Sequence, residues 1–271
     1  MPEKTIEDAA VLAHEAYAGA YRILTLRAPG IAPRVRPGQF VHAQLPAPAD
    51  AILRRPFSVF QAEADGTLRI LYKPVGRGTA AMLRLKPGDT LSLIGPLGRG
   101  FPVEEQPTDA LPVLVAGGYG MAALYLAARA LRPAGMAFFG GATAADILCE
   151  PDFTALGWDV RAATVDGSRG EPGLVTAALD RWLANERADR VPVFYVCGPN
   201  GMLRAVGERA QAGGWKAWLS LDRNMGCGVG ACLTCVQKIR RDAADDWEWA
   251  RCCKEGPVFE CRQVVWDASD R

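Results

Sequence analysis

The stretch LPVLVAGGYGMAALYLAARAL, Leu111 to Leu131, marks a change in the character of the chain. It begins as an apolar run typical of a buried strand, passes through a glycine turn and ends in strong helix formers. Strands and helices keep alternating downstream, with strand-like MAFFGGA, VRAATVDGS and VPVFYVCGPNG between helical VTAALDRWLANE and MLRAVGERAQAG. Such alternation is typical of a parallel sheet with helices on both faces. Residues 108–217 are therefore predicted to form a doubly wound α/β domain.

Upstream of this stretch the pattern is different. Short runs rich in β-branched and aliphatic residues alternate with turn signals, and no helical stretch separates them. The runs are YRILTL, QFVHAQL, TLRILYK and TLSLIG, and the turns are RPGQ, EADG, KPGD and GPLG. Closely spaced strands of this kind indicate a small antiparallel barrel or sandwich over residues 1–103.

Downstream, only about fifty residues follow WKAWLSL, and they hold most of the eight cysteines. MGCGVGACLTC, Met225 to Cys235, gives the spacing Cys227-x4-Cys232-x2-Cys235. This is the spacing of plant-type [2Fe–2S] ligation, which needs one further cysteine. The small residues keep the loop tight and leave its amides free to face cluster sulfurs. Residues 218–271 are therefore predicted to form a small [2Fe–2S] module.

The fourth ligand must come from RCCKEGPVFECRQ, which contains Cys252, Cys253 and Cys261. Spacing does not choose among the three. Adjacent side chains in extended backbone point in opposite directions, so only one of Cys252 and Cys253 is expected to face a cluster. Structural zinc is the alternative, but zinc sites usually show paired C-x2–4-C spacings. The only histidines, His14 and His42, are expected to lie far from the cysteines, in the barrel.

Composition excludes several function classes. The net charge is +1 and no Lys/Arg run is present, so nucleic-acid binding is not expected. No apolar run approaches the ~20 residues of a membrane span, and the N-terminal residues lack the apolar core of a signal peptide. We expect a soluble, cytoplasmic protein, in which cysteines bind metals or react more often than they form disulfides.

The motifs GCGVGACLTC and CKEGPVF together resemble the electron-transfer subunit of class 1B (NAD-dependent) dihydroorotate dehydrogenase, in the ferredoxin–NADP reductase-like superfamily. In that family the last cluster ligand immediately precedes a charged pair and G-P-V-F. The resemblance therefore implies a [2Fe–2S] cluster on Cys227, Cys232, Cys235 and Cys253, with Cys252 and Cys261 as spares.

The resemblance also covers the predicted barrel, which it identifies as an FAD-binding domain through RPGQF, RRPFS, GRGT and GPLGRGF. A pyrophosphate needs a fixed cation and backbone or hydroxyl donors, and Arg55, Gly78 and Thr79 can supply them. Ser58 is carried over as a neighbour of the isoalloxazine edge. The FAD-binding set is Arg55, Pro56, Phe57, Ser58, Leu71, Tyr72, Lys73, Gly78 and Thr79.

Two turns of the α/β half are candidates for NAD binding. Gly117, Gly118 and Gly120 lie where a helix begins, and a dinucleotide phosphate can bind at such an N-terminus. Tyr119 stands where the family often has a small aliphatic residue. Cys197, Gly198 and Pro199 resemble the C-G-P turn beside the nicotinamide.

A third turn bears on which dinucleotide binds. Asp166 resembles the residue near the adenosine ribose, where an acid suits a free 2′-hydroxyl and therefore NAD. Arg169 is close enough in sequence to keep NADP as an alternative.

No constellation for bond-breaking catalysis is present in the sequence. The three expected cofactors form an electron transformer, because flavin exchanges electrons with both a two-electron nicotinamide and a one-electron cluster. The resemblance implies a flavin-containing catalytic partner that oxidises dihydroorotate in pyrimidine biosynthesis, assembled with this chain as a heterotetramer. Two alternatives stay open: a related three-module NAD(P)H reductase for ferredoxin, polysulfide or another acceptor, and a zinc-stabilised, non-redox assembly subunit.

Two further side-chain predictions concern the C-terminal region and the α/β core. Trp247 and Trp249 alternate with acids between the third and fourth cluster cysteines. They are predicted to belong to a hairpin that shields the cluster, with a partner-contact face as the alternative. Cys149 is predicted to pack in the α/β core.

Overall fold

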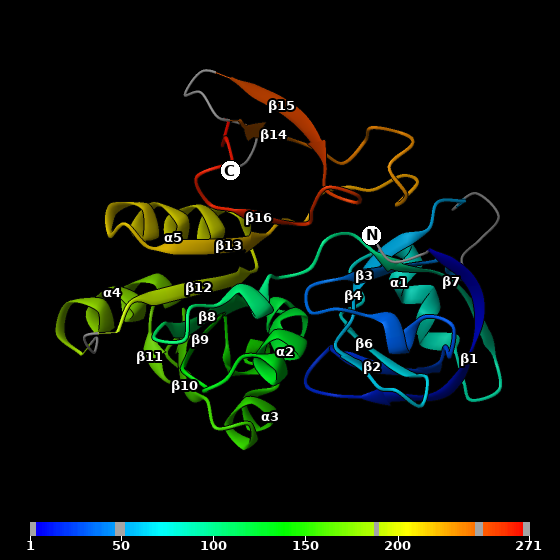
Figure 1. The fold of residues 1–271 in the computed structure, drawn as a ribbon. Helices are drawn as coiled ribbons and strands as arrows, with labels where there is room; N and C mark the ends of the chain where they lie inside the picture. The colour runs from blue at the N-terminus through cyan, green and yellow to red at the C-terminus, as the bar shows by residue number, and fades with distance from the viewer. Residues whose placement is uncertain (1–3, 47–51, 187–189, 242–245, 268–271) are drawn as a thin grey trace.

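The computed structural model describes residues 4–46, 52–186, 190–241 and 246–267. Three parts are visible in Figure 1: an antiparallel barrel that contains the N-terminus, an α/β domain beside it, and a C-terminal segment that lies across the top of both. This arrangement confirms the predicted fold class.

The barrel is a curled seven-stranded sheet in the order β4-β3-β7-β1-β2-β6-β5, with every pairing antiparallel. The predicted strands are confirmed as β2, β3, β6 and β7, whereas β1 is a long strand that the sequence patterns had not indicated. Alanines and acids dominate β1, so the sequence shows little alternation of hydrophobic and polar residues that would indicate a strand there. The elements are β1 (Thr5–Ala16), β2 (Arg22–Arg27), β3 (Phe40–Ala43), β4 (Arg55–Ser58), β5 (Gln61–Ala62), β6 (Thr67–Tyr72), α1 (Arg77–Ala81) and β7 (Thr90–Leu97).

Strand β3 is buried on both faces. Val41 and Ala43 belong to the barrel core, while Phe40 belongs to a different apolar cluster that includes Cys235 and Cys253. Successive side chains of a strand point to opposite faces, so His42 shares the outer face with Phe40. The outer face of β3 is therefore covered by the C-terminal segment.

The α/β domain has a seven-stranded sheet in the order β11-β10-β9-β8-β12-β13-β16, parallel except for the last pair, in which β16 (Val258–Glu260) is antiparallel to β13. Alternate residues of each strand point to opposite faces of the sheet, and a hydrophobic core lies on each face. Val113, Val115 and Phe194 pack with α4 and α5 on one face. Leu114 and Tyr195 pack with α2 and α3 on the other. The elements are β8 (Leu111–Gly117), α2 (Gly120–Ala130), β9 (Met136–Gly141), α3 (Glu150–Ala155), β10 (Asp159–Thr164), β11 (Glu171–Pro172), α4 (Val175–Asn185), β12 (Pro192–Cys197), α5 (Asn200–Ala212) and β13 (Lys216–Ser220). Short 3₁₀ turns lie at Ala32–Arg34, Met82–Arg84, Val103–Glu105 and Ala144–Asp146.

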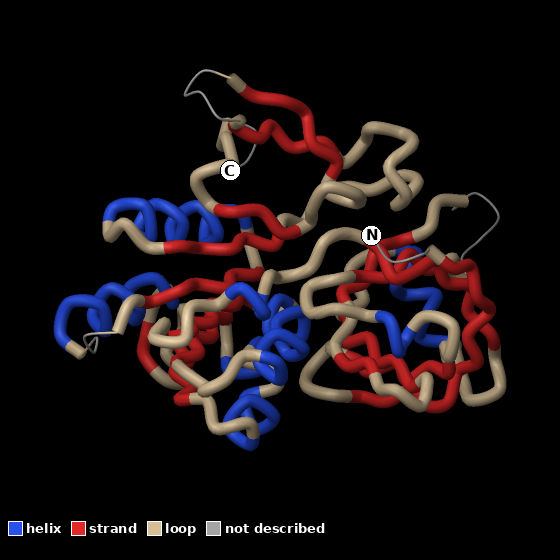
Figure 2. The backbone as a smooth tube through the Cα atoms, in the orientation of Figure 1, coloured by secondary structure: helices blue, strands red, loops and turns tan. Residues whose placement is uncertain are grey.

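The C-terminal segment is not a free-standing appendage. Strands β14 (Val236–Arg240) and β15 (Trp247–Arg251) pair with each other, but β16 (Val258–Glu260) pairs antiparallel with β13 and extends the α/β sheet. The predicted domain boundary between residues 217 and 218 falls within β13. Long loops, tan in Figure 2, carry the cysteine-rich stretch from β13 to β14 beside the barrel. No helix in the part of the chain that the structure describes is long and apolar enough to cross a membrane.

Candidate metal centre and cofactor sites

The loop between β13 and β14 folds its amides around the first two predicted ligands. The amides of Ala231 and Cys232 point at Sγ of Cys227, at 3.2 and 3.4 Å, and the amide of Cys227 points at Sγ of Cys232 at 3.3 Å. The Thr234 hydroxyl lies 3.1 Å from Sγ of Cys232. N–H groups directed at sulfur favour thiolates, as a metal cluster requires.

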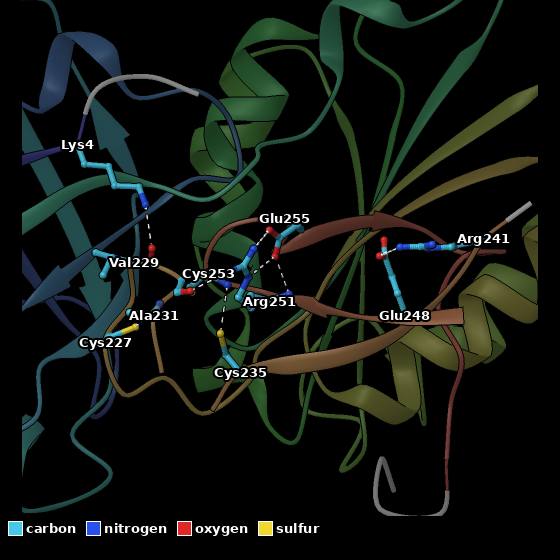
Figure 3. A network of polar contacts seen from close by, with 11 residues as sticks. Lys4, Cys227, Val229, Ala231, Cys235, Arg241, Glu248, Arg251, Cys253 and Glu255 are labelled. Carbon is cyan, nitrogen blue, oxygen red and sulfur yellow. Dashed lines mark hydrogen bonds and ion pairs between the residues drawn. The ribbon is translucent and has the colours of Figure 1, made fainter. Parts of the chain in front are cut away.

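The last two predicted ligands form a second pair, shown in Figure 3. The amide of Cys253 donates to Sγ of Cys235 at 3.4 Å, and both residues are almost fully buried. The amide of Cys252 donates instead to the Cys235 carbonyl at 2.9 Å. Cys261 lies beyond β16, where its thiol donates to Glu260. All eight cysteines are free thiols.

The pairing discriminates between kinds of metal site. No set of three or more His, Cys, Asp or Glu side chains among the described residues is placed to hold one metal ion. Structural zinc needs four ligands on a single ion, whereas a [2Fe–2S] cluster takes two thiolates on each of two irons. Cys227 with Cys232, and Cys235 with Cys253, match the second requirement.

The two pairs differ in electrostatic environment. Hydrogen bonds lower the pKa of Cys232 to about 6; those from Thr234 have the largest effect, and the one from the Cys227 amide has a smaller effect. Burial acts to raise the pKa of Cys227, but the amides of Val229, Cys232 and Ala231 outweigh it and lower that pKa. Burial is the main cause that raises the pKa of Cys253 to about 12, and the neighbouring Cys235 thiol acts in the same direction. The buried Cys253 thiol therefore needs the positive charge of a metal to become thiolate.

Cations from two distant elements hold the carbonyls on the outer side of the loop. Lys4, which precedes β1, donates to the Val229 carbonyl at 3.1 Å, and Arg251 at the end of β15 donates to the Gly230 carbonyl at 2.9 Å. Arg251 is itself held by an ion pair with Glu255 at 2.5 Å (Figure 3). The loop thus turns its carbonyls outward to cations and its amides inward to sulfur.

His42 corrects the expectation that both histidines lie far from the cysteines. Its imidazole is fully buried against Gly228, and a Cβ built on Gly228 would lie 2.4 Å from Nδ1. His14 does lie elsewhere, hydrogen-bonded to Leu85 and Tyr72. Burial lowers the pKa of His42, while the Cys227 carbonyl acts in the opposite direction. Spacing along the chain gave no sign of this contact.

The predicted phosphate-binding residues of the barrel lie where β4 begins and where α1 begins. Among the described residues, Arg55 hydrogen-bonds only to the backbone carbonyls of Leu53 and Arg54, and no carboxylate pairs with it. Thr79 accepts from the amides of Val75 and Gly76, at 2.9 and 3.2 Å. Among the described residues the Arg55 guanidinium has no anionic partner, which fits an anionic ligand such as a pyrophosphate.

The remaining FAD candidates lie on β4, on β6 and immediately after β6. Leu71 packs in the core shared with the α/β domain, whereas the Tyr72 ring lies in the barrel core and its hydroxyl bonds His14. Lys73 lies over the Tyr21 ring at 5.0 Å and pairs with Asp146 at 3.4 Å, which links the barrel to the α/β domain. Pro56, Phe57, Ser58 and Gly78 complete this set. A Cβ on Gly78 would lie 2.9 Å from the flexible end of the Leu45 side chain, which would have to shift to make room for it.

The two predicted nicotinamide turns lie side by side at the ends of β8 and β12. A Cβ on Gly120 would lie 2.1 Å from the Cys197 carbonyl, and one on Gly117 would lie 2.9 Å from Pro199. Gly118 has a φ of 55°, which favours glycine. The structure therefore assembles both turns at the carboxyl edge of the sheet, where open α/β sheets bind ligands.

Asp166 and Arg169 both have partners in the turn after β10. Asp166 accepts from the Ser168 amide at 3.0 Å and the Ser168 hydroxyl at 2.6 Å, and these bonds lower its pKa. Arg169 makes two hydrogen bonds to Glu150, at 3.2 and 2.7 Å. The cation that kept NADP binding as an alternative is therefore already paired with a carboxylate.

Two features join the nicotinamide turn and the cluster segment to their surroundings. The Tyr119 hydroxyl donates to Asp222 at 2.9 Å, between residues 103 positions apart. The β14–β15 pair leaves Trp247 and Trp249 exposed, packed on each other at 5.4 Å, with the Lys238 ammonium 3.8 Å above Trp247. These indole rings face solvent rather than the buried cysteines. Cys149 is buried in the α/β core, as predicted.

Comparison with known proteins agrees with this geometry. Residues 222–265 match the iron–sulfur cluster binding domain of dihydroorotate dehydrogenase B. The chain is 40% identical over 234 residues to the dihydroorotate dehydrogenase B (NAD(+)) electron transfer subunit of Geobacillus kaustophilus (strain HTA426), covering 85% of this chain and 87% of that protein. It is 38% identical over 246 residues to the same subunit of Geobacillus thermodenitrificans (strain NG80-2), covering 89% and 91%.

Among solved structures, that of an NADH-dependent reduced ferredoxin–NADP oxidoreductase, described in a study of flavin-based electron bifurcation, superimposes with a TM-score of 0.81 and 26% identity. The match covers 95% of this chain and 90% of that one. The family predicted from GCGVGACLTC and CKEGPVF is confirmed. With two fifths of its residues identical over most of both chains, this protein belongs to the electron transfer subunits of dihydroorotate dehydrogenase B.

Proposed function

We propose that the chain carries electrons from a dihydroorotate-oxidising catalytic subunit, by way of a [2Fe–2S] cluster and FAD, to NAD⁺ in pyrimidine biosynthesis. The observation that carries this proposal is the arrangement of Cys227 with Cys232 and of Cys235 with Cys253 as two pairs. The cysteines lie in the segment that matches the iron–sulfur domain, which packs against both the barrel and the α/β sheet.

When bound, the three cofactors supply hydride transfer at the nicotinamide, single-electron transfer at the cluster, and exchange between the two at the flavin. The chain's own residues bind and orient them. Arg55 and Thr79 hold the FAD pyrophosphate, and Ser58 lies at the flavin edge. The turns at 117–120 and 197–199 receive NAD, and Asp166 binds its ribose. No residue of this chain is assigned a role in oxidising dihydroorotate.

The partner follows from the relatives, which are named as electron transfer subunits of dihydroorotate dehydrogenase. We assign a flavin-containing catalytic subunit as that partner and a heterotetramer as the assembly. We place the complex in the cytoplasm, since all eight cysteines are free thiols and the cluster pairs must stay reduced. The exposed Trp247 and Trp249 lie on the segment that would meet the partner.

Absorption spectroscopy of the purified chain, followed by reconstitution with the catalytic subunit, tests this function. The chain should show flavin and [2Fe–2S] bands, and the reconstituted pair should reduce NAD⁺ with dihydroorotate. A colourless, zinc-containing chain would instead establish the assembly-subunit alternative.

A second candidate function has structural support. The ferredoxin–NADP oxidoreductase named above resembles this chain over nearly its full length. A related reductase for ferredoxin would use the same three modules. Faster reduction of ferredoxin than of NAD⁺ in the presence of the catalytic subunit would favour that candidate.

A further inference from the structure

His42 is a buried polar side chain with unmet hydrogen-bonding capacity. The residue is 0% exposed, and neither ring nitrogen has a hydrogen-bond partner among the described residues. Leaving a buried polar group unpaired destabilises the folded state, so such a group calls for an explanation. In either protonation state an imidazole carries at least one N–H, so the ring calls for an acceptor close by.

The ring is directed at the cluster loop. His42 lies on the outer face of β3, and its Nδ1 would be 2.4 Å from a Cβ on Gly228, so only glycine leaves room for the imidazole. Gly228 has a φ of 69°, a conformation that also favours glycine. Two backbone carbonyls act on the ring: that of Cys227, a predicted ligand, and that of Arg54 on the barrel side.

A second barrel residue contacts the next position of the same loop. Lys4 donates to the Val229 carbonyl at 3.1 Å, across 225 residues of sequence. His42 and Lys4 therefore meet the consecutive residues Gly228 and Val229 from the barrel side. The loop that carries Cys227 and Cys232 thus contacts the barrel as well as the rest of the C-terminal segment.

We propose that His42 is a positioning residue for the iron–sulfur cluster, whose imidazole N–H holds the Cys227 carbonyl and thereby fixes the Cys227–Cys232 loop against the flavin barrel. Holding this carbonyl outward fixes the peptide plane, and the amides that follow stay directed at sulfur. Hydrogen bonds to the sulfurs help set the reduction potential of such clusters. The inference rests on the proposed cluster and adds a barrel residue that tunes it.

The pairing of β3 with β4 connects the contact between His42 and Gly228 to the predicted flavin site. Phe40 pairs with Ser58 and His42 pairs with Pro56, so these four residues share one face of the strand pair. Ser58 is the candidate flavin neighbour. A single two-stranded unit therefore carries both the flavin-side residue and the residue that seats the cluster loop.

The test compares substitutions of the two histidines in the full chain with its cofactors. His42→Phe keeps an aromatic ring without nitrogen. It should shift the electron paramagnetic resonance signal and the reduction potential of the cluster, and speed loss of iron to a chelator about tenfold. His42→Asn or His42→Gln, which restore an amide donor near one ring nitrogen or the other, should return at least one of these readouts toward the parent. His14→Phe is the matched control and should leave the cluster signal unchanged.

Unchanged spectrum, potential and chelator resistance in His42→Phe would overturn the proposal, as would equal changes in His14→Phe. If His42→Phe does not fold, Gly228→Ala, His42→Ala and their double variant replace it. Rates of iron loss that simply multiply in the double variant would refute the contact, because residues that touch are not additive. Absence of any cluster signal in the unaltered chain would instead refute the proposed function.

Discussion

The backbone amide of Cys253 points at the thiol of Cys235, 3.4 Å from its sulfur. Cys252, one residue earlier, directs its amide to the Cys235 carbonyl instead. The Cys235 and Cys227 thiols both act, after burial, to raise the pKa of Cys253. This geometry supports the prediction that Cys253, rather than its neighbour, is the fourth cluster ligand.

Cys253→Ser should abolish or severely weaken the [2Fe–2S] absorption and resonance signals, because serine removes a thiolate from the second pair. Cys252→Ser is the matched control, an adjacent buried thiol, and should retain the cluster. Iron and acid-labile sulfide assays on both purified variants check this outcome. The reverse pattern would assign the fourth ligand to Cys252.

Arg55→Ala should weaken FAD retention far more than it weakens the fold. Losing a buried charge-assisted contact costs ~1.5–3 kcal/mol, which corresponds to roughly a tenfold to hundredfold loss of affinity. The flavin content after extensive dialysis measures the effect. Arg69→Ala removes an exposed arginine of β6 whose side chain hydrogen-bonds only to Gln61 among the described residues, and this variant should keep its flavin. Equal flavin content in the two variants would contradict the role of Arg55.

NAD should be preferred over NADP, because Asp166 would repel a 2′-phosphate and Arg169 is paired with Glu150. Glu150→Gln should release Arg169 and raise turnover with NADPH relative to NADH in a dye-reduction assay. Glu171→Gln, which removes the carboxylate that pairs with Arg181, is the control and should not alter the ratio. A parent chain that uses NADPH as well as NADH would show that Asp166 does not set the preference.

The isolated chain, loaded with its cofactors, should oxidise NADH with artificial one-electron acceptors and should not act on dihydroorotate. The sites assigned above bind cofactors, and no general base for a carbon-bound proton has been identified in the sequence. Adding the catalytic subunit should create NAD⁺-dependent dihydroorotate oxidation that neither chain shows alone. Activity of the single chain on dihydroorotate would disprove this division of labour.

In the reconstituted pair, Cys227→Ser should abolish coupled NAD⁺ reduction while NADH oxidation by dyes at the flavin persists. The physical reason is that loss of one ligand removes the one-electron carrier but leaves the barrel and the nicotinamide turns intact. Stopped-flow absorption of the flavin and steady-state NADH formation separate the two activities. If the Cys227→Ser variant still reduces NAD⁺ with dihydroorotate in the reconstituted pair, the cluster does not carry electrons between the partner and the flavin.

Local patterns were sufficient for much of this architecture. Runs of β-branched and aliphatic residues between turn signals identified β2, β3, β6 and β7, and the alternation of strands and helices identified the parallel sheet, because both depend on neighbouring residues. The spacing of Cys227, Cys232 and Cys235 indicated the cluster, since one short loop must deliver all three thiolates. Spacing alone left the fourth ligand open, and only the resemblance of CKEGPVF singled out Cys253.

The sequence by itself thus determined the three modules and their cofactor chemistry. The tertiary structure alone decided how the modules meet. It placed β16 at the edge of the α/β sheet, Tyr119 on Asp222, and His42 against Gly228. His42 appeared remote from the cysteines because almost the whole α/β domain lies between them in the chain. Such contacts depend on how complete surfaces pack, and no local periodicity encodes which buried face will cover another.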